Sequence, residues 1–136
     1  MTKPVLRDAD YEMLADFRHM LRQFTAFSEG KAAAQGLTAQ QHQALLTIRA
    51  ARPEKATVGH VAERLILKPH STTGLIDRLE ALGLIVRRTS TVDRRQALLA
   101  LTDKAQTILA ELSATHREEI RRLRPLLTAL LDRAGD

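Results

Sequence analysis

The hydrophobic and polar positions of this chain repeat mostly with the period of an α-helix. From Asp8 to Glu29, apolar side chains recur three or four positions apart, which predicts one long amphipathic helix. Lys31–Gly36 is predicted to be a frayed end or loop that closes at Gly36. Thr38, with Gln41 three residues on, has the pattern of a capping box and predicts a second helix that ends before Pro53. The inner face of that second helix is predicted to be Gln41, Ala44, Leu45 and Ile48.

A pair of short helices follows, with Thr57 as the N-cap of the first. The spacing predicts helices over Val58–Ile66 and His70–Leu82, separated at Pro69 and ended by Gly83 as the C′ residue. The predicted buried positions are Val58, Val61, Ala62 and Leu65 in the first helix, and Leu75, Ile76, Leu79 and Leu82 in the second. The opposite side of the second helix then presents His70, Ser71, Thr72, Thr73 and Arg78 to the outside.

Strand-like segments come next, at Leu84–Arg88 and Ala97–Leu101. The residues between them, Thr89–Arg95, are polar or charged apart from Val92, which predicts a hairpin with an arginine-rich tip. A helix–turn–helix followed by such a hairpin is a winged helix–turn–helix. The fold class is therefore mainly α, with about six helices and a short β-hairpin wing.

The C-terminal part of the chain returns to helical spacing. Thr102 is predicted to cap a helix that runs to Leu123, with Asp103 next to its positive end. Pro125 either kinks this helix or starts a separate one, Leu126–Arg133. We expect one domain over residues 1–136, in which 37–101 is the DNA-binding lobe and 8–36 and 102–136 form a helical dimerisation region. The predicted interface residues are Leu14, Phe17, Leu21, Leu123, Leu126, Leu127, Leu130 and Leu131; the alternative is that these helices close the monomer's own core.

Composition and charge narrow the function. The chain has 136 residues, no cysteine and a net charge of +5, which excludes disulfides and thiolate metal ligands. Residues 55–95 carry eight basic and four acidic side chains, so most of the excess charge lies in the predicted winged helix–turn–helix. A basic surface confined to one module is typical of phosphate binding. No apolar run is long enough for a membrane span and no secretory signal is recognised, so we expect a cytoplasmic protein.

The segment Leu79–Ile85, the residues Asp93 and Arg95, and the Leu101–Thr102 strand end resemble the MarR family of bacterial transcriptional regulators. Ala105 departs from the family, which often has glycine there, but alanine is the better helix former. The resemblance implies a homodimer in which the first helix also packs on the partner subunit. It also implies insertion of Arg95 into the DNA minor groove with Asp93 holding its guanidinium, and a small aromatic acid or phenol as effector.

The residue types support this function. Short polar side chains near the start of a recognition helix contact base edges or phosphates, although Ser71 has helix capping as an alternative role. Lys68, Arg87 and Arg88 are candidate phosphate contacts, while Arg78 either reaches a phosphate or pairs with Asp77 or Glu80. The predicted DNA-binding residues are Lys68, His70, Ser71, Thr72, Thr73, Arg78, Arg88, Asp93, Arg94 and Arg95.

Other functions fit less well. No catalytic motif is present, and no cofactor is indicated. A zinc-responsive regulator is the main alternative, because His19, His42 and His116 lie on three predicted helices and Glu119 lies three residues after His116. A winged helix used only for protein contact is a third class, against which the wing arginines argue.

Overall fold

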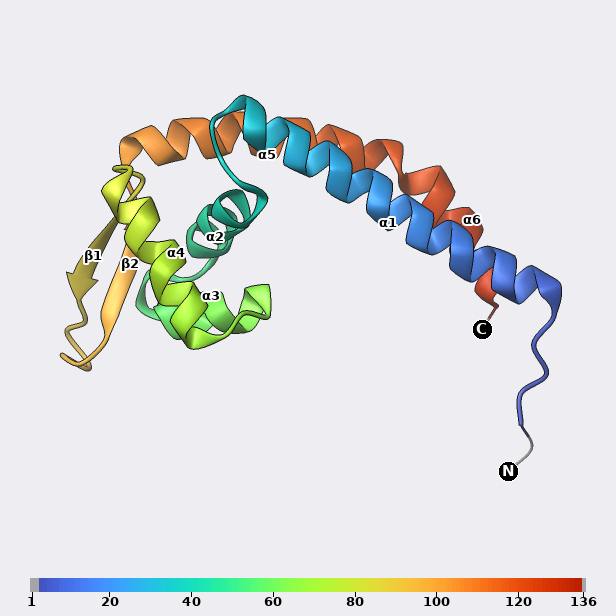
Figure 1. Cartoon of the computed structure of the whole chain (residues 1–136), viewed down its shortest axis with the longest axis horizontal. Coiled ribbons are helices and arrows are strands. Elements are labelled where there is room, and N and C mark those ends of the chain that lie inside the picture. Colours follow the sequence, from blue (N-terminus) through green and yellow to red (C-terminus); the bar gives the residue numbers. More distant parts are fainter. Residues whose placement is uncertain (1–2, 136) are drawn as a thin grey trace.

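The computed structural model describes residues 3–135 (Figure 1). The elements are α1 (Asp8–Ala34), α2 (Ala39–Ala50), the 3₁₀ turn η1 (Pro53–Lys55), α3 (Val58–Leu65), α4 (Pro69–Ala81), β1 (Ile85–Thr89), β2 (Ala97–Leu101), α5 (Asp103–Arg122) and α6 (Arg124–Ala134). Helices α2, α3 and α4 and the β1–β2 hairpin form a lobe, from which α1, α5 and α6 extend together as a long arm. The described chain begins and ends at the end of the arm that is remote from the lobe.

Three threonines begin helices, as the sequence predicts. Thr38 accepts a hydrogen bond from the backbone N–H of Gln41 while the Gln41 side chain accepts one from the Thr38 N–H, which completes the capping box of α2. Thr57 caps α3 by accepting from the N–H of His60. Thr102 caps α5, and its hydroxyl also donates to the carbonyl of Gly83 at 2.7 Å. That second bond ties the start of the arm to the end of the helix–turn–helix.

Two glycines end helices by turning into the left-handed region. Gly36 has φ +77°, and the N–H groups of Gly36 and Leu37 bond back to the last turn of α1. Gly83 (φ +73°) ends α4 in the same way. The turn between α3 and α4 reaches this region with Ile66 (φ +54°), a β-branched residue for which the conformation is strained. Ile66 is 91% exposed, so packing within residues 3–135 does little to offset that strain.

Some predicted boundaries and faces are wrong. Helix α1 continues to Ala34, five residues beyond Glu29, because residues 31–34 are good helix formers and Ala32 is fully buried against the lobe. Leu82 was expected in the core but is 48% exposed. It is the C-cap of α4, and the turn at Gly83 instead brings Leu84 into the core ahead of β1.

Residues 3–135 form two hydrophobic cores. The larger one fills the lobe and also takes in residues from the lobe ends of α1 and α5, so arm and lobe share one packed junction. The smaller one lies in the arm, where Met20 of α1 packs against Leu123 and Leu130. Pro125 lies in the first turn of α6 and starts a separate helix, which resolves the choice left open by the sequence. No helix among residues 3–135 has both the length and the apolar character needed to cross a bilayer.

Candidate nucleic-acid interface

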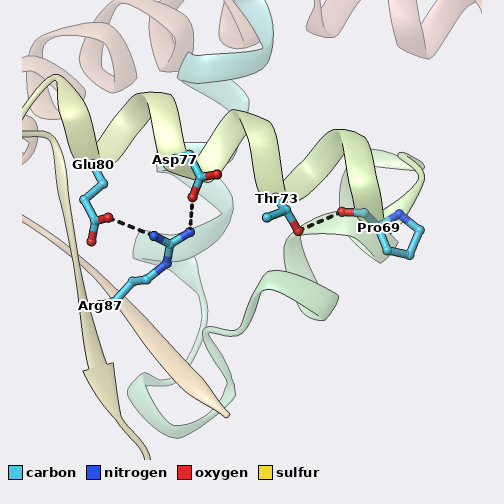
Figure 2. A network of polar contacts seen from close by, with 5 residues as sticks. All are labelled: Pro69, Thr73, Asp77, Glu80 and Arg87. Carbon is cyan, nitrogen blue, oxygen red and sulfur yellow. Dashed lines mark hydrogen bonds and ion pairs between the residues drawn. The ribbon is translucent and has the colours of Figure 1, made fainter. Parts of the chain in front are cut away.

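The exposed start of α4 presents the short polar side chains that the sequence predicts for a recognition helix. His70, Ser71 and Thr73 are exposed there, next to Lys68 and Pro69. Within residues 3–135, no side-chain cap hydrogen bond is found at the start of α4, so the capping role considered for Ser71 is not observed. The Thr73 hydroxyl donates to the carbonyl of Pro69 at 3.1 Å (Figure 2), which leaves its oxygen able to accept from a ligand.

Thr72 does not belong to this surface, and the prediction that its side chain faces outward is wrong. It is fully buried, and its hydroxyl donates to the carbonyl of Lys68 at 2.9 Å. Residues 72, 75, 76 and 79 lie on one stripe at helical spacing, so Thr72 continues the apolar face of α4. The local hydrogen bond satisfies its polar group and removes most of the penalty for burying it.

The two arginines of β1 differ because side chains alternate along a strand. Arg88 is exposed on one face of the hairpin. Arg87 lies on the face of the buried Ile85 and reaches α4, where it binds Asp77 and Glu80 (Figure 2). The partner of these carboxylates is thus Arg87, and the pairing with Arg78 that the sequence left open as one alternative is not observed. The hydrogen bond that Arg87 donates to Asp77, aided by the negative charges of both carboxylates, raises the pKa of Arg87 above its ordinary value.

Arg78 is exposed on α4, and no ion pair of Arg78 is found among residues 3–135. A side chain at Gly74 would meet only the tip of Arg78, at 3.7 Å, which is ordinary contact. Within residues 3–135, close packing of another helix therefore does not explain why position 74 is a glycine. The space beside Gly74 stays open toward the exposed side of α4.

The wing is a two-stranded antiparallel hairpin in which Arg87 is paired with Leu99 and Thr89 with Ala97. Its tip is organised by Ser90, which the sequence did not single out. The buried Ser90 hydroxyl accepts from the N–H groups of Val92 and Asp93. A serine that begins a polar turn is the signal that could have identified it.

Asp93 and Arg95 pair at this tip, as the resemblance implies. The Asp93 carboxylate accepts from the backbone N–H of Arg95 at 3.0 Å and from its Nε at 3.3 Å. The Arg95 side chain remains 92% exposed. The guanidinium is therefore held at its base while its outer nitrogens face solvent, and the neighbouring Arg94 is also exposed.

A cleft of about 430 Å³ lies where the arm meets the lobe, between α1, α2 and α5. Phe24, Leu46 and Ile120 give it apolar walls, and the exposed Arg117 and Arg121 contribute cationic groups. Its lining is mostly apolar with a few polar groups, as in sites for small organic ligands.

A histidine pair lies against this cleft. The rings of His42 and His116 are 4.8 Å apart. His116 Nδ1 lies 2.6 Å from the Leu112 carbonyl, which can only accept, so Nδ1 carries a proton and Nε2 accepts from the Ser28 hydroxyl in the neutral ring. His42 is buried, and its Nδ1 has no partner in the described chain. Burial, followed by the charge of His116, lowers the pKa of His42.

The zinc site suggested by the three histidines is not formed. His42 and His116 do meet, but His19 lines a different pocket with Asp16 and Arg133 on the arm. His19 precedes Ser28, the partner of His116, by nine residues on α1, which is about 14 Å along a helix. His19 is therefore too far from His116 to share a metal ion with it. Glu119 pairs with Arg122 instead. Across residues 3–135, no three histidine, aspartate or glutamate side chains come together as metal ligands.

The arm separates the predicted dimerisation residues into two groups. Leu123 and Leu130 are buried in the arm's own core and Leu127 packs partly against them, so those positions close the monomer. The remaining predicted positions are 39–69% exposed. Tyr11 and Ile120, which the sequence did not predict for the interface, are exposed on the same arm. The exposed set is Tyr11, Leu14, Phe17, Leu21, Ile120, Leu126 and Leu131, hereafter the arm stripe.

Comparison with known proteins adds an independent result. Residues 35–96 match the model of the MarR family. The chain is 35% identical over 94 residues to the HTH-type transcriptional repressor MdtR of Bacillus subtilis (strain 168), an alignment that covers 69% of this chain and 59% of MdtR. The chain thus spans less than two thirds of the length of this curated relative.

Solved structures share the fold. AbsC, a MarR family transcriptional regulator from Streptomyces coelicolor, superposes with a TM-score of 0.74 at 20% identity, over 97% of this chain and 96% of AbsC. The Staphylococcus aureus MepR–DNA complex gives a TM-score of 0.70 at 20% identity, over 79% of this chain and 76% of MepR. At these identities the likeness establishes the winged-helix fold.

Proposed function

Since the winged helix–turn–helix of this chain, residues 35–96, belongs to the MarR family, we propose that the protein binds double-stranded DNA as a sequence-specific transcriptional regulator. The family and its named relative are regulators and not enzymes, in agreement with the sequence analysis. The observation that carries the proposal is the pairing of an exposed recognition-helix start with a wing whose Arg95 is oriented by Asp93. One element suits the major groove and the other the minor groove.

The exposed residues divide by role. His70, Ser71 and Thr73 are proposed to contact base edges, because hydroxyl and imidazole groups donate and accept hydrogen bonds. The cationic groups Lys68, Arg78, Arg88 and Arg94 are proposed to contact phosphates, which position the protein without reading sequence. We propose that it acts in the cytoplasm, as the sequence predicts.

Fluorescence anisotropy tests this function. The full chain is titrated against a duplex selected from a random pool and against the unselected pool, at several salt concentrations. We expect tighter binding to the selected duplex, with an affinity for both that falls as salt rises, because phosphate binding releases counterions. Failure to bind either duplex at low salt would overturn the proposal.

The functional unit is proposed to be a homodimer that reads a pseudo-palindrome. One recognition helix contacts only a few base pairs, and a two-fold axis doubles those contacts. The arm stripe supports this arrangement, because seven large apolar side chains are left exposed on the three helices of the arm. Half-site centres about one helical turn apart, 10–11 base pairs, would put both helices on one face of the duplex.

We further propose that the protein is a repressor released by a small aromatic acid or phenol in the arm–lobe cleft. The name of MdtR supports repression, and the apolar walls with Arg117 and Arg121 suit an aromatic body with an acidic group. A ligand there would contact both the arm and the recognition lobe, and so would favour one of their relative positions. A thermal-shift screen of aromatic carboxylates and phenols, followed by anisotropy with each hit, tests this; hits that raise the melting temperature but leave DNA bound would refute release.

A further inference from the structure

We propose that Arg87 is a positioning residue for DNA recognition, which masks the two carboxylates of the recognition helix without touching DNA itself. This inference rests on the proposed DNA-binding function. It reverses the expectation that Arg87, like Arg88, is a phosphate contact. It also assigns a role to Asp77 and Glu80, which the predicted interface leaves out.

The geometry is a fork between two elements. Arg87 Nη2 lies 2.6 Å from Asp77 Oδ1, and Nη1 lies 2.8 Å from Glu80 Oε1. Figure 2 shows the arginine reaching from β1 to α4, with one nitrogen aimed at each carboxylate. The Arg87 side chain is 29% exposed, whereas Asp77 and Glu80 are 59% and 43% exposed. The cation is thus the best covered of the three groups and has both outer nitrogens occupied.

The strand fixes this role through its register. Arg87 pairs with Leu99, which is buried and whose N–H donates to the carbonyl of Ala56 at 2.7 Å. This bond holds β2 against the lobe, and β2 in turn holds the backbone of β1 at Arg87. Alternation then points Arg87 toward α4, and its neighbour Arg88 the other way.

Electrostatics gives the arrangement a function. Asp77 and Glu80 are the only acidic residues of α4, and Asp77 lies one turn beyond Thr73 on the same side of the helix. A free carboxylate close to the groove would repel phosphates and oppose the cations around it. Arg87 donates hydrogen bonds to both groups and draws them toward the wing. Its side chain stays charged at every pH at which DNA binds.

Charge removal separates masking from direct contact. Arg87→Gln is expected to weaken binding to the selected duplex about tenfold, in the range typical of losing one charge contact. Asp77→Asn/Glu80→Gln/Arg87→Gln should recover affinity to within about threefold of wild type, because no carboxylate then needs masking. If Arg87 bound a phosphate, this triple variant would stay as weak as the single one.

The salt dependence provides a readout that a purely structural role would not produce. Each phosphate contact contributes a slope of about −0.9 to log K against log salt. Arg88→Gln, the matched control on the opposite face of the same strand, should reduce the slope by about that amount. Arg87→Gln should leave the slope unchanged, and a reduced slope would overturn the proposal.

Two further variants keep the test decisive. Arg87→Lys keeps the charge but loses the two-pronged geometry, so its affinity should fall between those of wild type and Arg87→Gln. A lysine variant that binds more weakly than Arg87→Gln would contradict the proposal. If Arg87→Gln does not fold, Asp77→Asn/Glu80→Gln serves instead: it frees Arg87 and should bind at least as tightly as wild type, and weaker binding would overturn the proposal. A wild-type chain that binds no duplex refutes the proposed function, whereas a binding wild type with an equally tight Arg87→Gln variant refutes only the masking role.

Discussion

Replacing Leu126 and Leu131 of α6 with aspartate is expected to dissociate the proposed dimer without unfolding the chain. Both side chains are exposed in the isolated chain, 51% and 69% respectively, so the monomer does not depend on them. Leu130 would be the wrong target, since it is 8% exposed and packs against Met20. A charge there would disrupt the arm's own core and leave the interface untested.

The magnitude follows from these exposures. Full burial of a leucine side chain is worth about 1.5–3 kcal/mol, so the half or more that remains exposed is worth about 1 kcal/mol when a partner covers it. A two-fold axis repeats each substitution, which gives four altered sites per dimer and a loss of about 4 kcal/mol. At about 1.4 kcal/mol per tenfold, association weakens roughly a thousandfold, before any penalty for desolvating the new carboxylates.

Sedimentation velocity over a range of protein concentrations measures the effect. Wild type should sediment as a dimer at micromolar concentration, and the double variant as a monomer with an unchanged circular dichroism spectrum. Ile66→Asp is the matched control, because it puts the same charge at an exposed apolar residue outside the arm and should stay dimeric. A double variant that remains dimeric would refute the assignment of the interface to α6, and a monomeric wild type would refute the dimer.

Four other outcomes are expected. Arg95→Ala should weaken binding to all duplexes by about 1–3 kcal/mol and reduce the salt slope by about one. Anisotropy at two salt concentrations checks this, and a variant that binds as tightly as wild type at both would contradict the role of the wing. Thr72→Ala should lower the melting temperature by opening space in the lobe core, whereas Thr73→Ala should leave melting unchanged and reduce the preference for the selected duplex over the random pool. The contribution of neutral His42 to the free energy of unfolding should be fully present above pH 6.5 and be lost as pH drops toward the folded pKa, because burial lowers that pKa and the unfolded chain then binds more protons. Thermal melts of His42→Leu should therefore show a smaller fall in melting temperature between pH 7 and 5 than wild type, and parallel curves for the two proteins would argue against this role of His42. Ile66→Gly should stabilise the chain by about 1 kcal/mol, because glycine adopts the positive φ without strain, and a lower unfolding midpoint in urea would contradict that account.

The sequence by itself determined the features that depend on a few neighbouring residues. A threonine before a helical stripe caps it through its own hydroxyl, and a glycine after one ends it through its own backbone freedom, so Thr38, Thr57, Thr102 and Gly83 are predicted correctly. The Asp93–Arg95 pair, which the family resemblance implies, is also local, since both residues lie in one turn. These signals establish the order of the helices and the hairpin, and with it the fold.

Only the tertiary structure decided which side chains those elements bury and which distant groups meet. Thr72 enters the core because α4 packs along a stripe that contains it, and its hydroxyl donates to the carbonyl of Lys68, the N-cap of that helix. Arg87 binds α4 because the hairpin folds back beside that helix, and His42 meets His116 because α2 and α5 pack against each other at the junction. In each case the partner lies at least a helical turn away and mostly on another element. Burial and charge pairing follow from packing in three dimensions, which a local pattern constrains but does not determine.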